Sequence, residues 1–148
     1  MPLRLIVVGK KSSMLDDFES RFYKRIRAWS KFEIIELKES RAKTVAQRKK
    51  QEAEKILQQS QRFILFDEHG QNLGSKQWAS FIEKQTANAC LDWVIGGADG
   101  VDDSIKQKAH ATWALSKLTL PHQLVRVTVV EQLYRALTIM KGHPYHRS

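Results

Sequence analysis

Short apolar segments alternate along this chain with longer segments in which apolar residues recur every three or four positions. The short segments are rich in β-branched and aromatic residues, a composition typical of buried strands. They cover residues 3–8, 32–37, 62–67, 91–95 and 115–120. The first of them, LRLIVV, is almost continuously apolar, as expected of a parallel strand covered on both faces. Strands that alternate with helices predict an α/β fold with a parallel sheet.

The longer segments predict helices. The first has an apolar stripe with helical spacing, formed by Leu15, Phe18, Phe22, Ile26 and Trp29. Three of these helices are preceded by a side chain that can accept a hydrogen bond from a free backbone N–H group. These candidate caps are Ser12 or Ser13, Thr44 with Gln47 in a capping box, and Asp102 or Asp103. A further helix, which carries Trp78, is expected to start at Ser75.

The last helix is the least certain from local propensity, because residues 125–130 are mostly β-branched and favour a strand. Helical spacing nevertheless relates Val125, Val129, Leu133, Leu137 and Met140. A second apolar side is formed by Leu124, Val127, Val130 and Tyr134. A helix that is apolar on two sides is expected to be buried on two sides. We therefore expect a helix that ends near Gly142 and whose second side meets another subunit in a homodimer.

Length and composition predict one domain, residues 1–148, with a core of its own. No segment approaches the roughly 20 apolar residues of a membrane span, and the apolar run at residues 2–9 is too short for a signal peptide. The only cysteine, Cys90, excludes an internal disulfide and a cysteine-cluster metal site. A cytoplasmic protein is the natural expectation.

The net charge of +9 is unevenly distributed. Residues 1–60 contain 15 Lys and Arg against 8 Asp and Glu, and the remainder contains 10 against 8. This asymmetry favours a polyanionic partner, although charge alone does not distinguish RNA from DNA, and a solvated basic face is the alternative. The first helix offers Arg21, Lys24, Arg25 and Arg27, and the second offers Arg48, Lys49 and Lys50 on a side expected to be exposed.

Three candidate loops, at residues 66–70, 95–100 and 115–121, follow apolar strands that the pattern predicts. Ligands of open α/β sheets bind beyond the carboxyl ends of the strands. The glycine-rich turn GGADG at 96–100 lacks the Gly-x-Gly-x-x-Gly spacing, and no Walker lysine motif is present. Nucleotide phosphate binding is therefore not indicated, and a tight strand-to-helix turn remains an alternative interpretation of these glycines.

Taken together, several segments resemble the RlmH (formerly YbeA) family, the SPOUT-class methyltransferases of bacterial large-subunit ribosomal RNA. The resemblance extends along the whole chain and depends on the combination of motifs rather than on any single one. The motifs are LRLIVVGK at 3–10, IGGADG at 95–100, LSKLTLPH at 115–122, RV at 126–127, EQLYRA at 131–136 and HPYHR at 143–147. Residues 44–60 contribute little to it.

This resemblance implies a SPOUT-type parallel sheet with helices on both faces and a C-terminal deep trefoil knot. The pattern alone indicates only a doubly wound α/β domain, because knots are rare. The resemblance also implies a homodimer and an S-adenosyl-L-methionine cofactor bound in the knot. The cofactor-binding residues expected by position are Phe66, Gly96, Gly97, Leu115, Ser116, Lys117, Leu118, Thr119 and Leu120.

Two features of that site follow from the resemblance. Backbone groups of packed loops would hold the cofactor, so few charged side chains are expected, and Gly96 and Gly97 would give the cofactor room. Phe66 stands where the family usually has leucine, and its ring could line an adenine pocket. Without the resemblance, residues 115–120 would be interpreted as an ordinary core strand.

The implied reaction is methyl transfer to N3 of a pseudouridine in 23S ribosomal RNA, on the assembled ribosome. The sulfonium already activates the methyl group, so no metal is expected. Because N3 carries a proton, a general base would help. Tyr145 and His146 are the candidates, and Arg147 could bind phosphate or stabilise the deprotonated base. Arg126 and Arg135 are alternative cations, and a solvated tail without a role is the alternative to all of these.

Two other functions fit parts of the sequence. A non-catalytic RNA-binding module would need the basic surface but no cofactor. A small-molecule α/β enzyme would need the loops but not the charge.

Overall fold

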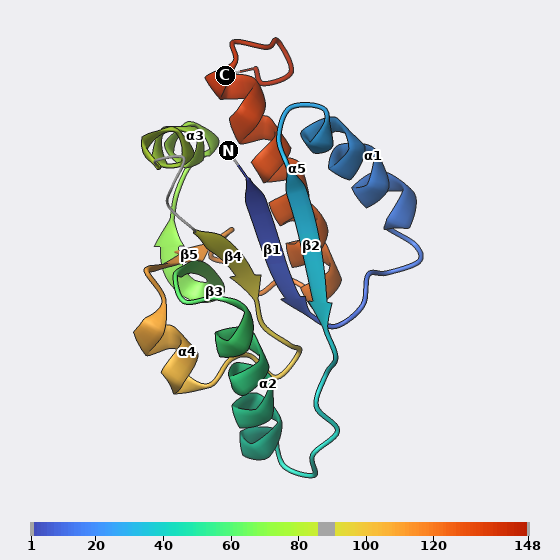
Figure 1. Cartoon of the computed structure of the whole chain (residues 1–148), viewed down its shortest axis with the longest axis vertical. Helices are drawn as coiled ribbons and strands as arrows, with labels where there is room; N and C mark the ends of the chain where they lie inside the picture. Colours follow the sequence, from blue (N-terminus) through green and yellow to red (C-terminus); the bar gives the residue numbers. More distant parts are fainter. Residues whose placement is uncertain (1, 86–90, 148) are drawn as a thin grey trace.

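The fold is an α/β sandwich built on one parallel five-stranded sheet. We describe residues 2–85 and 91–147 of a computed structural model, so Cys90 lies outside the described residues. The strands run in the order β2-β1-β4-β3-β5 (Figure 1). Their bounds are Leu3–Val8 for β1, Phe32–Leu37 for β2, Phe63–Asn72 for β3, Asp92–Ile95 for β4 and Ala111–Ala114 for β5. The sequence-based expectation of an α/β fold with a parallel sheet is confirmed.

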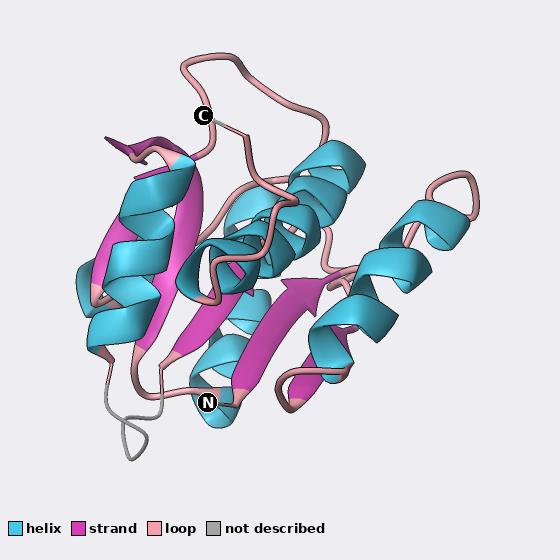
Figure 2. Cartoon of the chain, turned by 90° about the horizontal axis from the view of Figure 1, so that it is seen from above, coloured by secondary structure: helices cyan, strands magenta, loops and turns pink. Residues whose placement is uncertain are grey.

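Helices cover both faces of the sheet (Figure 2). Their bounds are Asp16–Arg27 for α1, Val45–Gln59 for α2, Ser75–Lys84 for α3, Asp103–Lys108 for α4 and His122–Met140 for α5. Side chains of β1 alternate between two cores, as the two-residue period of a strand requires. Leu3, Leu5 and Val7 join the core beneath α1, α3 and α5. Ile6 and Val8 join the core beneath α2 and α4.

Two predicted boundaries at the end of the sheet are wrong. The fifth strand is Ala111–Ala114 rather than 115–120, because Trp113 and Ala114 are the buried residues that pair with β3. The chain from 115 onward is a loop, in which Leu118 is 70% exposed. The third strand, in contrast, continues past residue 66 and pairs with β5 again after a register shift. Gly70 permits this close approach, since a Cβ there would lie 2.7 Å from the Thr112 backbone.

The helix starts agree with the sequence in part. Thr44 and Asp102 cap α2 and α4 as expected, accepting hydrogen bonds from the backbone N–H groups of Gln47 and Ser104 at 3.1 Å each. The predicted cap of α1 is wrong, because the helix begins only at Asp16 after an N-cap Leu15 without a side-chain hydrogen bond. α3 begins at Ser75, as expected, and Gly74 is its N-cap.

The last helix, α5, is a helix as its spacing predicted, and Gly142 follows it with a positive φ of 67°. Its burial has a different cause from the one expected. α5 packs against α1 on one side and α3 on the other, so Val130 (0% exposed) and Tyr134 (6%) are already buried within the chain. The expectation that this second side meets another subunit is therefore wrong, and the homodimer needs a separate argument. Leu124 alone of that side remains largely exposed.

Within the described ranges, no helix combines the length and the apolar character that crossing a bilayer requires. The same residues contain no cluster of three or more His, Cys, Asp or Glu arranged to hold a metal ion.

Candidate functional site

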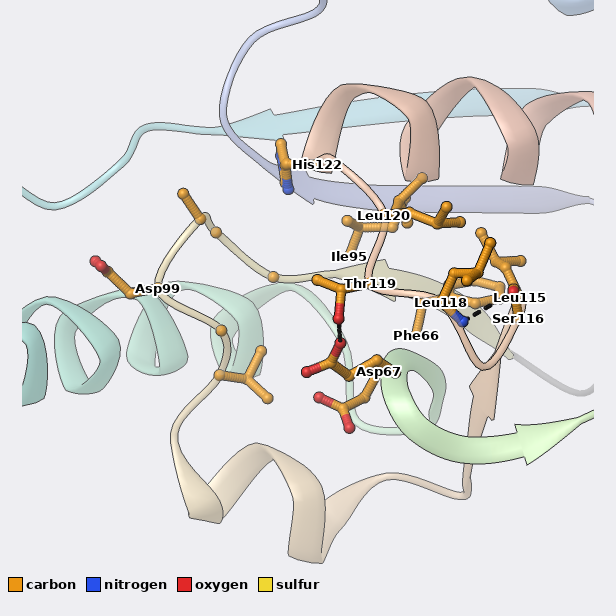
Figure 3. A pocket seen from close by; sticks show the side chains of 17 residues that line it. Phe66, Asp67, Ile95, Asp99, Leu115, Ser116, Leu118, Thr119, Leu120 and His122 are labelled. Atoms are coloured by element: carbon orange, nitrogen blue, oxygen red, sulfur yellow. Dashed lines mark hydrogen bonds between the residues drawn. The ribbon is translucent and has the colours of Figure 1, made fainter.

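A pocket of about 320 Å³ opens at the carboxyl end of β4 and beside the middle of β3, where Phe66 pairs with Ile95 (Figure 3). Three segments form most of it: residues 66–68 of β3, residues 95–101 after β4, and the loop between β5 and α5. His122 and Val125 at the start of α5 complete the lining. The pocket thus lies where ligands of open α/β sheets usually bind.

Eight of the nine candidate cofactor residues line this pocket. These eight are Phe66, Gly96, Gly97, Leu115, Ser116, Leu118, Thr119 and Leu120. Lys117 is the exception, because its residue is exposed and stands outside the lining. The fold therefore brings together three segments that are up to 54 residues apart in the chain, from Phe66 to Leu120.

The two glycines of the turn are packed closely against side chains of the protein itself. A Cβ on Gly96 would collide with the Val101 side chain. A Cβ on Gly97 would lie 2.7 Å from Glu52 Oε1 and 3.2 Å from Val8 Cγ1. A Cβ on Gly97 would thus meet residues outside the pocket lining, whereas Val101, which a Cβ on Gly96 would meet, itself lines the pocket. The close packing fixes the position of this turn, and the room that the glycines would give a cofactor stays a prediction.

The loop between β5 and α5 is held by two side-chain hydrogen bonds. Thr119 Oγ1 donates to Glu68 Oε2 at 2.6 Å, which ties this loop to β3 across the pocket (Figure 3). Ser116 Oγ accepts from the Leu118 backbone N–H at 3.0 Å, which forms a local turn. The turn leaves the Leu118 side chain exposed at the pocket edge.

Phe66 serves the core as well as the pocket. Its ring is 8% exposed and lies 5.5 Å from the Trp78 ring and 6.2 Å from the Trp93 ring, centroid to centroid. An aromatic residue at this position therefore extends a stacked aromatic cluster under α3, and its small exposed part lines the pocket.

Carboxylates line the pocket, which the sequence reasoning missed. Asp67, Glu68 and Asp99 contribute to the lining, whereas no Lys or Arg among the described residues does. Asp99 forms an ion pair with Arg48, whose Nε lies 2.8 Å from Asp99 Oδ2. This hydrogen bond lowers the pKa of Asp99 below its ordinary value of 3.8. Three acids among seventeen lining residues agree with the expectation of few charged side chains, but their shared negative sign was not predicted.

His122 is a second residue that the sequence reasoning left out of the site. It lines the pocket at the first residue of α5. Its Nε2 atom is buried, and no described residue forms a hydrogen bond with it. The motif around Pro121 contained this histidine, but only the fold places it beside the glycine turn.

The C-terminal tail is packed against the molecule instead of being freely solvated. The Tyr145 ring lies 4.9 Å from the Tyr134 ring and 6.1 Å from the Phe22 ring. The guanidinium of Arg135 lies 4.8 Å from the Tyr145 ring centroid, and its NH1 lies 3.1 Å from His146 Nδ1. Burial, followed by the charge of Glu131, raises the pKa of Tyr145 above 10.0. Arg147 remains exposed.

The tail and the pocket lie at opposite ends of α5 (Figure 1). The helix begins at the pocket with His122 and ends at Met140, just before the tail. Nineteen residues at 1.5 Å each give a helix of about 28 Å. The structure therefore does not bring Tyr145, His146 and Arg147 to the pocket of their own chain.

The basic residues fall into two groups with different surroundings. Arg21, Lys24, Arg25 and Arg27 are exposed on α1 beside the tail, and the Arg25 guanidinium lies 5.1 Å from the Phe22 ring centroid. Arg48, expected to be exposed, is instead tied to Asp99 and to the Ala42 carbonyl, the latter at 3.1 Å.

Arg126, an alternative cation for the substrate, is only 3% exposed. It lies between two carboxylates, with Nε 2.7 Å from Glu19 Oε1 and NH1 2.6 Å from Glu36 Oε2. Burial alone would lower its pKa, but these carboxylates raise the pKa of Arg126 above its ordinary value. A substrate role for Arg126 is therefore excluded by its position, and its role is to join α5 to α1 and β2.

A parallel sheet with a pocket beside the carboxyl end of a strand is typical of α/β proteins that bind a small ligand. The sequence pattern of the family described as "Predicted SPOUT methyltransferase" matches residues 1–146. The chain belongs to this family of SPOUT methyltransferases.

Its relatives share similarity along the full length. A Rhizobium leguminosarum bv. trifolii protein named ribosomal RNA large subunit methyltransferase H is 40% identical, with 99% of each chain covered. Proteins of the same name from Caldicellulosiruptor saccharolyticus and Methylobacillus flagellatus are 37% and 40% identical, and at least 98% of each chain is covered.

Proposed function

We propose that this protein transfers a methyl group from S-adenosyl-L-methionine to N3 of a pseudouridine in 23S ribosomal RNA, on the assembled ribosome in the cytoplasm. The observation that carries the proposal is the pocket built jointly from residues 66–68, 95–101 and 115–120 in a chain of the SPOUT methyltransferase family. Full-length similarity to proteins named ribosomal RNA large subunit methyltransferase H supports the substrate class.

The pocket fits the proposed cofactor in size and in charge. About 320 Å³ lies within the range of small-molecule sites. Backbone of residues 96–100 and 115–120 would hold the adenine and methionine parts, and the Phe66 edge would border the adenine. The buried His122 Nε2 offers a further hydrogen bond. When bound, S-adenosyl-L-methionine supplies an already activated methyl group, so the protein's task is alignment and management of the N3 proton.

The tail is better suited to donate hydrogen bonds than to remove a proton. A guanidinium only donates, so the 3.1 Å contact from Arg135 NH1 makes His146 Nδ1 an acceptor and leaves Nε2 carrying the proton. The raised pKa of Tyr145 keeps its phenol protonated at neutral pH. We therefore assign Tyr145, His146 and Arg147 to stabilising negative charge on the deprotonated pseudouridine rather than to general-base catalysis. The N3 proton then passes to solvent.

The length of α5 supports a homodimer. One tail lies about 28 Å from the pocket of its own chain, too far for groups that must touch the same nucleotide. A second copy that places its tail at this pocket would complete the site. The separation of the tail from the pocket, and no longer an apolar second side of α5, thus supports a homodimer.

The RNA would lie along α1 and the tail. Arg21, Lys24 and Arg25 are exposed on α1 next to the side chain of Phe22, which contacts Tyr145. Phosphate contacts of this kind position a nucleic acid without specifying its sequence. The shape of the assembled ribosome would then supply selectivity.

The connection from β5 to α5 supports the knot and the single domain that the proposed function implies. The chain leaves β5 at one edge of the sheet and passes residues 66–68 of β3 and the carboxyl end of β4. It enters α5 near β1, where Gln123 Nε2 donates to the Lys10 carbonyl at 3.2 Å. We propose that this crossing forms the deep trefoil knot within a single domain, residues 1–148.

Calorimetric titration with S-adenosyl-L-methionine separates this function from a non-catalytic RNA-binding module. We expect saturable binding with one site per chain, and absence of heat at millimolar cofactor would contradict the proposal. The salt dependence of RNA binding separates it from a small-molecule enzyme. Affinity should fall steeply between about 50 and 200 mM salt if several phosphates are contacted, and a flat response would favour the small-molecule enzyme.

A further inference from the structure

The pocket has a charge opposite to that of the whole molecule. The chain carries a net charge of +9, yet the charged side chains lining the pocket are the carboxylates of Asp67, Glu68 and Asp99 among the described residues. A polyanionic substrate explains the basic surface but does not explain the acidic side chains in the cavity. The negative charge of the pocket lining instead matches a cationic ligand.

Two of these carboxylates accept hydrogen bonds from neutral groups. Asp99, in contrast, is paired with Arg48 at 2.8 Å. Asp67 Oδ2 accepts from the His69 backbone N–H at 3.0 Å, and Glu68 Oε2 accepts from the hydroxyl of Thr119. Neither forms an ion pair with a Lys or Arg among the described residues, although Glu68 Oε1 lies 3.5 Å from His69 Nε2, an imidazole that is 82% exposed.

Both carboxylates belong to the cavity and not to an isolated surface cluster. They follow Phe66 directly on β3, and both line the pocket. The hydrogen bond from Thr119 holds Glu68 at 2.6 Å beside the loop of residues 115–120. A ligand enclosed by that loop therefore lies close to both acids.

We propose that Asp67 and Glu68 are specificity-determining residues that favour the cationic methyl donor over the neutral product of transfer. This inference rests on the proposed function. In the reaction, the bond from methyl carbon to sulfur breaks while a bond from that carbon to the deprotonated N3 forms. The electron pair of the broken bond stays on sulfur, so the sulfonium becomes a neutral thioether. Transfer thereby removes the positive charge that the carboxylates stabilise, and the pocket releases the product more readily than it releases the donor.

The size of the preference is modest because both acids are partly solvated. Charge pairs of this exposure are worth about two- to fivefold in affinity each. The two together should favour S-adenosyl-L-methionine over S-adenosyl-L-homocysteine by about tenfold at low salt. The preference should shrink as salt screens the charges.

The test is calorimetric titration of the full-length protein with three ligands: S-adenosyl-L-methionine, S-adenosyl-L-homocysteine and sinefungin, in which a protonated amine replaces the sulfonium. Asp67→Asn and Glu68→Gln remove charge but keep an oxygen that can accept the observed hydrogen bonds. We expect both variants to bind the neutral product as the wild type does. They should bind the two cationic ligands more weakly, about two- to fivefold for each variant and about tenfold for the double variant.

Glu83→Gln is the matched control, since it removes one exposed carboxylate from the end of α3, outside the pocket. It should leave all three affinities unchanged. An unchanged ratio of donor to product affinity in the double variant would overturn the inference while leaving the proposed function intact. If neither donor nor product binds to the wild type, the proposed function itself fails. A circular dichroism melt confirms that each variant is folded.

Discussion

At the scale of single residues, the buried position of Arg126 determines what this side chain does. Its motif suggested a cation near the substrate, but the side chain is buried between Glu19 and Glu36. A charge at this depth is tolerated only because it is paired. Glu36 also accepts from the Lys11 backbone N–H at 3.0 Å, so one cluster links the end of β1, α1, β2 and the start of α5.

Arg126→Met should destabilise the protein by about 3–5 kcal/mol, because it leaves the buried Glu19 without its partner. Urea unfolding followed by circular dichroism measures this change. Arg21→Met on the exposed side of α1 is the control and should stay within about 0.5 kcal/mol of the wild type. Equal effects from the two substitutions would show that the Arg126 cluster contributes nothing specific.

Gly97→Ala should weaken cofactor binding and lower stability by about 1–3 kcal/mol. The physical reason is the 2.7 Å approach of the added Cβ to Glu52 Oε1, which must displace the glycine turn. Calorimetry and urea unfolding report the two effects. Gly74→Ala is the matched control, since its Cβ meets only Gln77 Oε1 at an ordinary 3.6 Å. Removing the obstructing side chain in Gly97→Ala/Glu52→Ala should restore part of the affinity, and no recovery would argue against this cause.

Tyr145→Phe should reduce the transfer rate without altering the shape of its pH profile between about pH 6 and pH 9. Because the pKa of Tyr145 is raised above 10.0 by burial, the phenol is protonated throughout that range. The same shift has a consequence for stability: the contribution of the neutral phenol is complete below pH 10 and is lost as the pH rises beyond it. A profile whose rising limb disappears in the variant would instead identify Tyr145 as the base.

At the scale of elements, the sequence predicted helices and strands well where periodicity was strong and poorly where tertiary contacts decide. The first two strands and the helical nature of α5 were predicted correctly. Residues 115–120 were mistaken for a strand because an apolar run has the same appearance in a strand and in a pocket-lining loop. The second apolar side of α5 was assigned to another subunit, because a sequence does not show that α1 lies against it.

The candidate site residues, like the helices and strands, were predicted from the sequence only in part. The resemblance located the glycine turn and the loop before α5, and the fold brings them together with Phe66. It did not reveal Asp67, Glu68 or His122, whose roles depend on side chains meeting across the cavity. Nor did it show that α5 separates Tyr145 from the pocket.

Removing residues 145–148 should leave the cofactor affinity within about twofold of the wild type and reduce methyl transfer by about a hundredfold or more. The reason is that the tail packs on Phe22 and Tyr134 at the far end of α5 and does not line the pocket. Calorimetry and a transfer assay on the same preparation measure both quantities. Full activity in the shortened protein would exclude a substrate role for the tail.

At the scale of the whole molecule, the proposed function requires the pocket and the tail to act on the same nucleotide, although α5 separates them within one chain. Mixing the tail-shortened protein with Gly97→Ala tests whether two chains do. One pocket of each mixed dimer would have both an intact glycine turn and an intact tail. Random exchange should therefore restore roughly a quarter of the wild-type transfer rate. No recovery after subunit exchange would indicate that the tail acts within its own chain.

The central claim is methyl transfer to large-subunit ribosomal RNA, and a labelled methyl-transfer assay tests it most directly. Assembled ribosomes, free subunits and naked RNA from cells lacking the activity are incubated with the protein and methyl-labelled S-adenosyl-L-methionine, and the modified nucleotide is mapped. We predict label in one pseudouridine of 23S ribosomal RNA, with assembled ribosomes as the best substrate. Absence of label from all three substrates, despite saturable cofactor binding, would contradict the proposed function.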